Sequence, residues 1–442
     1  MKRYIHSFFL YSFFLISFPP LVHAENFFEV FYLGLQHDPL LRQSEAEYQI
    51  ALQAYPIARA ALLPQLSFSA SRKRTHESIE GTTFGVANSS DTYFTEKYSI
   101  NLTQSLYNRD YYVLLKQSKS TIAQALAKRD SMRQDLIIRT AVAYFDALEA
   151  LDNLQFATSE KAAISKQLDE AKRRFSVGLT AITDIKEAEA SYDLSVAREI
   201  DAKNQSDIIF EKLSLITGHQ HNRLSPLSNN MSLSLPEPSD SQAWVDKATQ
   251  YNLDLLAKMK ELEVAEDEIE HQRADHYPTL DVVGSTSNTD KGGGVSGAIE
   301  TDNNMIGIEF NIPLFAGGST FYKTREAVYA REKVKEQLEQ KRREVIQKTR
   351  DSYLNVSSGV SRVNALKRAL ESTEVAAQST QAGFDVGTRS SVDVLLSLKD
   401  TYAAKRDYSR ARYDYIIATL LLKQSIGALS QDDVELINAW LD

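Results

Sequence analysis

Apolar residues follow two different periods along this chain. In long segments they recur with a helical period, and in four short segments they alternate with polar residues. The clearest long segment runs from 109 to 176 and lacks both glycine and proline, the residues that most often interrupt a helix. Within it Ile137, Tyr144 and Leu151 repeat at heptad spacing beside a second apolar row. Two adjoining rows predict a long helix with neighbours on both sides.

Three further segments have the same character, and helices are predicted over 184–217, 319–383 and 392–427. Helices in globular domains usually have about 8–20 residues, so these lengths indicate coiled-coil packing. At about 1.5 Å per residue, the helix over 109–176 would extend roughly 100 Å. That is several times the ~30 Å hydrocarbon layer of a membrane.

The four alternating segments form two predicted strand pairs, at about 65–107 and about 279–315. In the last of them Ile306, Ile308 and Phe310 alternate with polar residues or glycine, and the polar positions of the pairs are rich in Ser, Asn and Thr. Period two predicts a strand with one apolar and one polar face. A half-buried soluble sheet and a membrane β-barrel both show this pattern, and the strands alone favour neither.

The two halves of the chain resemble each other. "FSVGLTAITD", from Phe175, and "FDVGTRSSVD", from Phe384, share Phe, Val, Gly and Asp in one frame, and each lies between two predicted helices. Each half therefore has the order helix, strand, strand, long helix, corner, helix, which predicts an internal twofold repeat. The predicted parts are a first repeat over 25–225 with its tip at 177–183, a proline-containing linker over 226–240, and a second repeat over 241–442 with its tip at 385–391.

Four strands are too few for a membrane barrel of one chain. Such barrels begin at about eight strands and leave no open edge in lipid. If these strands enter a membrane, several chains must share one barrel, and three chains would supply twelve strands.

The first 24 residues are predicted to be a secretory signal peptide. Lys2 and Arg3 precede an apolar run, and Ala24 ends a pattern of small residues suited to cleavage before Glu25. Beyond it no apolar run reaches the roughly 18 residues of a transmembrane helix, so entry into a membrane would require strands. The net charge of −9 argues against a nucleic-acid partner.

Catalytic and metal-binding patterns are not found in the sequence. There is no cysteine, which excludes disulfides, thiolate metal sites and a cysteine nucleophile. The histidines are scattered, and phosphate loops, nucleophile elbows and paired-metal motifs are missing. We therefore expect no enzyme activity, no cofactor and no metal.

Several stretches carry a family resemblance. "TAVAYFDALEALDNL", "RRFSVGLTAITDIKEAEASYD", "FNIPLFAGG" and "FDVGTRSSVDVLLSLKDTY" resemble TolC-family outer-membrane efflux proteins, and the likeness covers the chain from Glu25 to about Asp442. It implies a mixed α and β homotrimer with a 12-stranded transmembrane β-barrel and a long α-helical coiled-coil barrel in the periplasm, with the linker over 226–240 in the equatorial region.

The resemblance also implies a function. The protein would be an outer-membrane exit duct for multidrug efflux or type I secretion. It would passively conduct drugs or polypeptides that an inner-membrane pump delivers through a periplasmic adaptor. A secreted or periplasmic coiled-coil structural or adhesive protein without a channel is the alternative that we retain at this stage.

The two corners would be the periplasmic tips of the duct. The resemblance assigns adaptor contact to Val177, Gly178, Leu179, Val386, Gly387 and Thr388. From the residues alone, the glycines could equally serve turn geometry, because glycine tolerates positive φ.

Gate residues follow from the same resemblance. Asp393, Asp184, Arg389, Thr183 and Phe384 would form the channel constriction and gate, with Arg389 pairing with Asp184 and Asp393 forming a ring of three carboxylates that favours cations. An N-cap role for both aspartates is compatible with this.

Two departures from the family pattern change the expected gate. Phe384 stands where tyrosine is common, and Leu396 where a second constricting aspartate is often found. We therefore expect fewer closing links and a weaker cation site than in a relative with two carboxylate rings.

Overall fold

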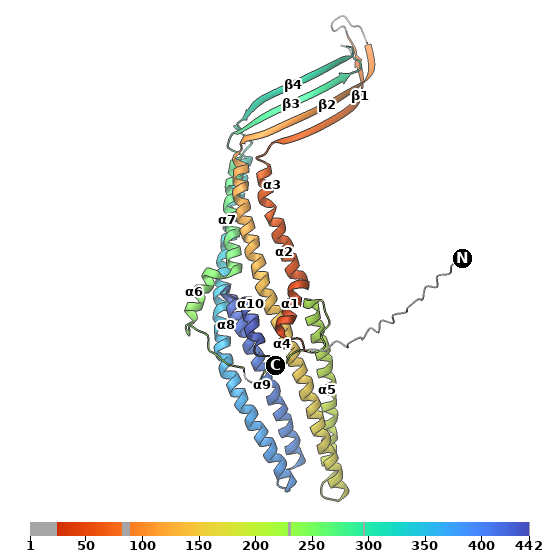
Figure 1. Cartoon of the computed structure of the whole chain (residues 1–442), viewed down its shortest axis with the longest axis vertical. Coiled ribbons are helices and arrows are strands. Elements are labelled where there is room, and N and C mark those ends of the chain that lie inside the picture. Colours follow the sequence, from red (N-terminus) through yellow and green to blue (C-terminus); the bar gives the residue numbers. More distant parts are fainter. Residues whose placement is uncertain (1–23, 82–88, 229–230, 295–296, 442) are drawn as a thin grey trace, which may run out of the picture.

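The computed structural model describes residues 24–81, 89–228, 231–294 and 297–441, so the predicted signal peptide lies outside the described residues except for Ala24. The chain is elongated: a β-sheet lies at one end, and helices extend from it to two separate hairpin tips at the other (Figure 1). Over these residues the fold is mostly helical with four strands. Within the described residues, none of the helices combines the length and apolar character needed to cross a membrane.

The elements follow one another in a similar order in the two halves. The first half contains α1 (Phe27–His37), α2 (Pro39–Leu52), α3 (Ala54–Ala60), β1 (Gln65–Ile79), β2 (Ser89–Tyr107), α4 (Arg109–Ser176) and α5 (Ile182–Thr217). The second contains α6 (Ser241–Tyr251), α7 (Leu253–Ala274), β3 (Thr279–Lys291), β4 (Ile299–Asn311), α8 (Ser319–Asp385), α9 (Ser391–Ser425) and α10 (Gln431–Asn438). The helix predicted from 184 begins at Ile182, because Ala181 is the last residue in extended conformation. The helix predicted to 427 ends at Ser425.

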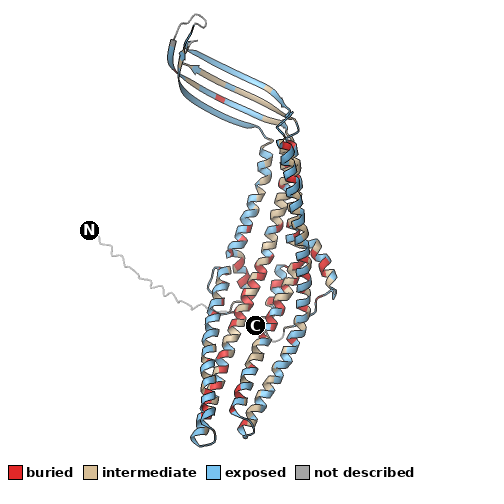
Figure 2. Ribbon diagram, turned by 180° about the vertical axis from the view of Figure 1, so that it is seen from behind, coloured by how far each residue is buried: buried red, intermediate tan, exposed pale blue. Residues whose placement is uncertain are grey.

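The four strands form one antiparallel sheet in the order β1-β2-β3-β4. The register aligns Leu66 with Leu102, Leu102 with Gly284 and Gly284 with Ile306, so the apolar alternate positions of the strands share one face. That face is uncovered: Leu66 is 72% exposed and Ile306 85%. Figure 2 shows most of the sheet as exposed or intermediate. A soluble sheet would bury this face against helices, and here no described element does so.

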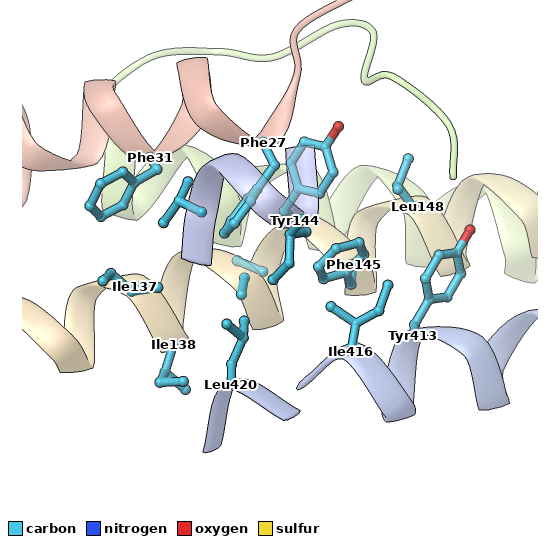
Figure 3. Packing of buried hydrophobic residues seen from close by; sticks show 14 of the residues in the cluster. Phe27, Phe31, Ile137, Ile138, Tyr144, Phe145, Leu148, Tyr413, Ile416 and Leu420 are labelled. Atoms are coloured by element: carbon cyan, nitrogen blue, oxygen red, sulfur yellow. The ribbon is translucent and has the colours of Figure 1, made fainter. Parts of the chain in front are cut away.

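The main hydrophobic core lies midway along the helices, where α1, α4, α9 and α10 meet (Figure 3). The ring centroids of Phe27 and Tyr144 are 5.6 Å apart, and those of Phe145 and Tyr413 are 5.7 Å apart. The Tyr144 hydroxyl donates to the Ser225 carbonyl at 2.9 Å, which satisfies its polar atom inside the core. Complete burial of such side chains contributes about 1.5–3 kcal/mol each. This core joins the two halves of the chain.

A glycine after α9 provides a test of this packing. Gly427 has φ +69°, and a Cβ placed on it would lie 2.2 Å from the Tyr251 carbonyl oxygen. Gly317 also has positive φ, at +63°, but nothing lies within 4 Å of its Cβ position. We expect Gly427→Ala to lower the thermal unfolding midpoint of the purified protein more than Gly317→Ala, measured by circular dichroism. Both variants lose about 1–2 kcal/mol to the left-handed backbone, and only the first must also displace Tyr251. Equal shifts would contradict the close approach.

Candidate functional site at the helical tips

Both tips end their long helix in the same way. At the first, the backbone N–H of Leu179 donates to the Arg174 carbonyl at 2.9 Å, and that of Gly178 donates to the Phe175 carbonyl at 2.9 Å. At the second, Thr388 donates to Gly383 at 2.8 Å. This is the Schellman pattern, which needs a left-handed residue after the helix. Gly178 has φ +75°, and its counterpart at the second tip has φ +82°. The glycines are therefore required by the turns themselves.

Apolar side chains project from these turns into solvent. Val177 is 67% exposed, Leu179 75% and Val386 76%. Nothing lies within 4 Å of a Cβ placed on Gly178 or Gly387, so the surface beside each glycine is open. Thr388 is exposed as well, at the second tip. Exposed apolar residues at a hairpin end, flanking open backbone, form a surface suited to a protein partner.

Asp393 occupies the third position of α9 in a capping box. The Ser390 backbone N–H donates to Asp393 Oδ2 at 3.0 Å, and the Asp393 N–H donates to Ser390 Oγ at 3.2 Å. Ser390 is thus the N-cap, which corrects the expectation that Asp393 fills that position. Hydrogen bonding from the Ser390 backbone, and then from its side chain, holds the pKa of Asp393 below its ordinary 3.8, and nearby Arg389 lowers it further. The carboxylate is therefore ionised at neutral pH.

Asp184 is likewise the third residue of its helix. The N-cap of α5 is Ala181, which makes no side-chain cap hydrogen bond, so the N-cap expectation is wrong for Asp184 too. Its carboxylate accepts a short hydrogen bond from the Thr180 hydroxyl. Thr183, the residue before it, is exposed.

Arg389 is exposed and lies against Gly383: a Cβ built there would be 2.8 Å from Arg389 Cγ. Among the described residues of one chain, neither Arg389 nor Asp184 takes part in a salt bridge. One chain therefore does not form the predicted Arg389–Asp184 pair, which stays a prediction for an assembly.

Phe384 joins the two hairpins through a contact that the sequence did not predict. Its ring is buried, and the guanidinium carbon of Arg174 lies 4.1 Å from its centroid. Arg174 is held in place by Glu170, whose carboxylate lies 3.1 Å from its Nη2. A second link lies two helical turns higher, where Gln167 Nε2 donates to Gln381 Oε1 at 2.8 Å. A tyrosine hydroxyl is missing at 384, but a cation–π contact is present, which in other proteins contributes about 0.5–2 kcal/mol.

Comparisons with known proteins agree over most of the chain. The family model described as outer membrane efflux protein matches residues 30–219 and 244–428. The outer membrane protein TolC of Vibrio cholerae is 36% identical over 428 residues, which cover 95% of this chain and 94% of that protein. The alkaline protease secretion protein AprF of Pseudomonas aeruginosa is 29% identical over 436 residues, covering 97% and 90%.

A solved structure shows the same fold. The CmeC outer membrane channel of Campylobacter jejuni matches with a TM-score of 0.80 at 16% identity, covering 95% of this chain and 90% of that one. At this identity the similarity concerns the fold alone.

The capping box predicts a pH dependence at the second tip. Because the pKa of Asp393 is lowered in the folded state, its stabilisation of α9 is complete above the ordinary value of 3.8 and is lost as the pH falls through the lowered value. We expect the first turn of α9 to lose hydrogen-exchange protection over that acidic range, measured by mass spectrometry and corrected for intrinsic exchange. Asp393→Asn should show weaker protection at neutral pH and little further change on acidification. An identical profile in both proteins would show that the carboxylate does not support the turn.

Proposed function

The chain belongs to the outer membrane efflux protein family, and we propose that it is the exit duct of a tripartite efflux or type I secretion system. It is an outer-membrane protein with a long periplasmic helical part, and it is not an enzyme. The observation that carries the proposal is the combination of an uncovered apolar sheet at one end of the chain with two helical tips at the far end (Figure 1). A coiled-coil structural protein would need no such sheet, and the family match removes that alternative.

Three copies would complete the membrane part. Among the described residues of one chain, β1 and β4 each pair with a single strand, so both edges of the sheet present unpaired backbone groups. In lipid such edges must be closed. Three sheets joined edge to edge give twelve strands, an even number within the range of outer-membrane barrels. The apolar face of each sheet would then contact lipid, and the polar face, where Ser69 and Ser99 hydroxyls lie 2.7 Å apart, would line the interior.

The helical part would be a duplicated unit. The hairpin of α4 and α5 and that of α8 and α9 have matching lengths and the same Schellman ends. Three chains would bring six such hairpins around one axis and form a tunnel. A periplasmic adaptor, and through it an inner-membrane pump, would dock at the six tips. Val177, Gly178 and Leu179 would form one contact surface, and Val386, Gly387 and Thr388 the other.

The gate would combine links within a chain with links between chains. Asp393 from three copies would form a carboxylate ring that attracts cations. Arg389, which has no ion-pair partner among the described residues of its own chain, would reach Asp184 and Thr183 of a neighbouring copy. Phe384 would hold the second hairpin against the first through Arg174. Separation of these contacts would open the duct.

The carboxylate ring can be tested by conductance. We expect the purified mature protein in planar bilayers to show small openings that multivalent cations block, and Asp393→Ala to lose that block. Ser390→Ala is the matched control, since it breaks the same capping box but keeps the carboxylate. Persistence of the block in Asp393→Ala would remove Asp393 from the constriction. Failure of the wild-type protein to insert into bilayers would contradict the duct itself.

The adaptor contact is best tested at the valine and leucine positions, because any substitution of the tip glycines also strains the turn. We expect Leu179→Asp and Val386→Asp to weaken adaptor binding by roughly tenfold or more, the effect of losing a central apolar contact. The measurement is efflux of a fluorescent dye from cells that produce each variant in place of the wild-type protein, at equal amounts in the outer membrane. Leu436→Asp, which alters an apolar residue of α10 that is 59% exposed, should export normally. Equal export by all three variants would show that the tips carry no essential contact.

A further inference from the structure

One face of α4 carries polar links to the second hairpin, roughly two helical turns apart. Asp152 accepts from the Tyr413 hydroxyl at 2.8 Å. Glu160 and Gln167 follow, and Arg174 lies nearest the tip. Toward the sheet, the same face is apolar and packs in the main core through Phe145. The surface between the hairpins therefore changes from apolar to polar in the direction of the tip.

Glu160 is unlike the other members of this row because it is a buried charge. The residue is 1% exposed, and it is the one charged residue among the largest fully buried side chains of the described chain. Its two carboxylate oxygens contact arginines of two different helices. Oε1 accepts from Arg198 Nη2 of α5 at 2.9 Å, and Oε2 lies 3.5 Å from Arg406 Nη1 of α9. A single carboxylate thus joins its own hairpin to the other one.

Below Glu160 the two hairpins share few buried contacts. The apolar cluster nearest the tips consists almost wholly of residues of the first hairpin, and Leu395 is its one member from the second: Ile164, Leu168, Ala171, Ile185, Ala188 and Leu395. The remaining links described above are the Gln167–Gln381 hydrogen bond and the Arg174–Phe384 contact. Above Glu160 the hairpins are joined by the main core. Glu160 marks the boundary between these two regions.

Separation of the hairpins would cost a different amount of free energy at each of these links. The amides of Gln167 and Gln381 and the guanidinium of Arg174 can be hydrated once they part, so little free energy is lost. Glu160 is 1% exposed and would lose its ion pair with Arg406, and breaking a charged link in such a buried position costs more free energy than breaking a hydrogen bond between neutral amides. Separation that begins at the tips should therefore stop at this residue.

The second half of the chain has no counterpart of this link. The alignment that pairs Gly218 with Gly427 places Ala369 at the position of Glu160 and Ala197 at that of Arg406. The ionic link is consequently specific to the contact between the two hairpins of one chain.

We infer that Glu160 is a positioning residue, which fixes how far along the helices the two hairpins of one chain can separate. Opening is confined to the segment between Glu160 and the tips, where the Gln167–Gln381 hydrogen bond and the Arg174–Phe384 contact break. The inference rests on the proposed function, in which the tips separate to open the duct. One buried carboxylate would thus determine how far from the tips the separation extends.

The test measures separation of the hairpins directly by pulsed electron resonance between two spin labels. Because the chain has no cysteine, labels can be introduced through paired cysteine substitutions without competing thiols. One pair, Leu179→Cys with Val386→Cys, reports on the tips. The other, Asp201→Cys on α5 with Lys367→Cys on α8, reports on the helices just beyond Glu160 on the side of the main core; both of these positions are exposed. Labelled chains are diluted into unlabelled ones, so that distances within one chain dominate.

Three variants are compared with the wild-type protein in each labelled background. Glu160→Gln removes the charge. Arg406→Gln removes only the partner on α9 and leaves Glu160 paired with Arg198, so it breaks the link between the hairpins by a second, independent substitution. Glu199→Gln is the matched control: it breaks an ion pair with Lys161 beside Glu160, but this pair joins α4 to α5 and does not reach the second hairpin.

We expect Glu160→Gln and Arg406→Gln to shift the α5–α8 distance distribution to longer values and to raise single-channel conductance. Glu199→Gln should leave both unchanged even if it lowers the thermal unfolding midpoint, which separates positioning from general stability. An unchanged α5–α8 distance in Arg406→Gln would overturn the inference, and so would an equal shift in Glu199→Gln. A distance shift in proteins that conduct no ions would support the role of Glu160 and contradict the duct, so the two failures are distinguishable.

Discussion

The packing of α4 against α9 around Phe145 and Tyr413 is the contact on which the rest of the molecule depends. α4 is one continuous helix from the sheet to the first tip, so its position determines where both ends lie. At mid-length it is held by side chains that are wholly or almost wholly buried, including Tyr144, Phe145 and Ile416. Because interiors of this kind are densely packed, the middle of the chain is expected to deform little. Movement is left to the segments beyond the core.

Apolar surface is left exposed at both ends of the chain. The apolar face of the sheet and the apolar residues of the tips have no covering element among the described residues. A monomeric soluble protein rarely leaves such surfaces exposed, because each invites association. In the proposed assembly the neighbours would be lipid and further strands at one end, and proteins at the other. A single chain thus leaves two different apolar surfaces uncovered, and both favour the duct assembly proposed for it.

Periodicity and the distribution of glycine and proline define much of the helical part in advance. α4 spans Arg109–Ser176, the segment that lacks both residues, since Asn108 caps its start and Gly178 supplies the left-handed turn after its end. The cap positions of Asp184 and Asp393 were wrong, because the turn residue that precedes each helix could not be fixed without backbone geometry. The Arg174–Phe384 contact was missed for a different reason. Its partners lie far apart in sequence, and their meeting depends on the register between two hairpins, which no local pattern encodes.

Asp393 illustrates how a local interaction can serve a property of the assembly. Carboxylates brought close together around an axis raise one another's pKa, since each disfavours the charge on the next. The Ser390 hydrogen bonds and Arg389 act in the opposite direction and lower the pKa of Asp393 within its own chain. In a ring of three such residues these contacts would oppose the rise in pKa that mutual repulsion causes. The capping box thus favours the ionised form of Asp393 as well as the first turn of α9.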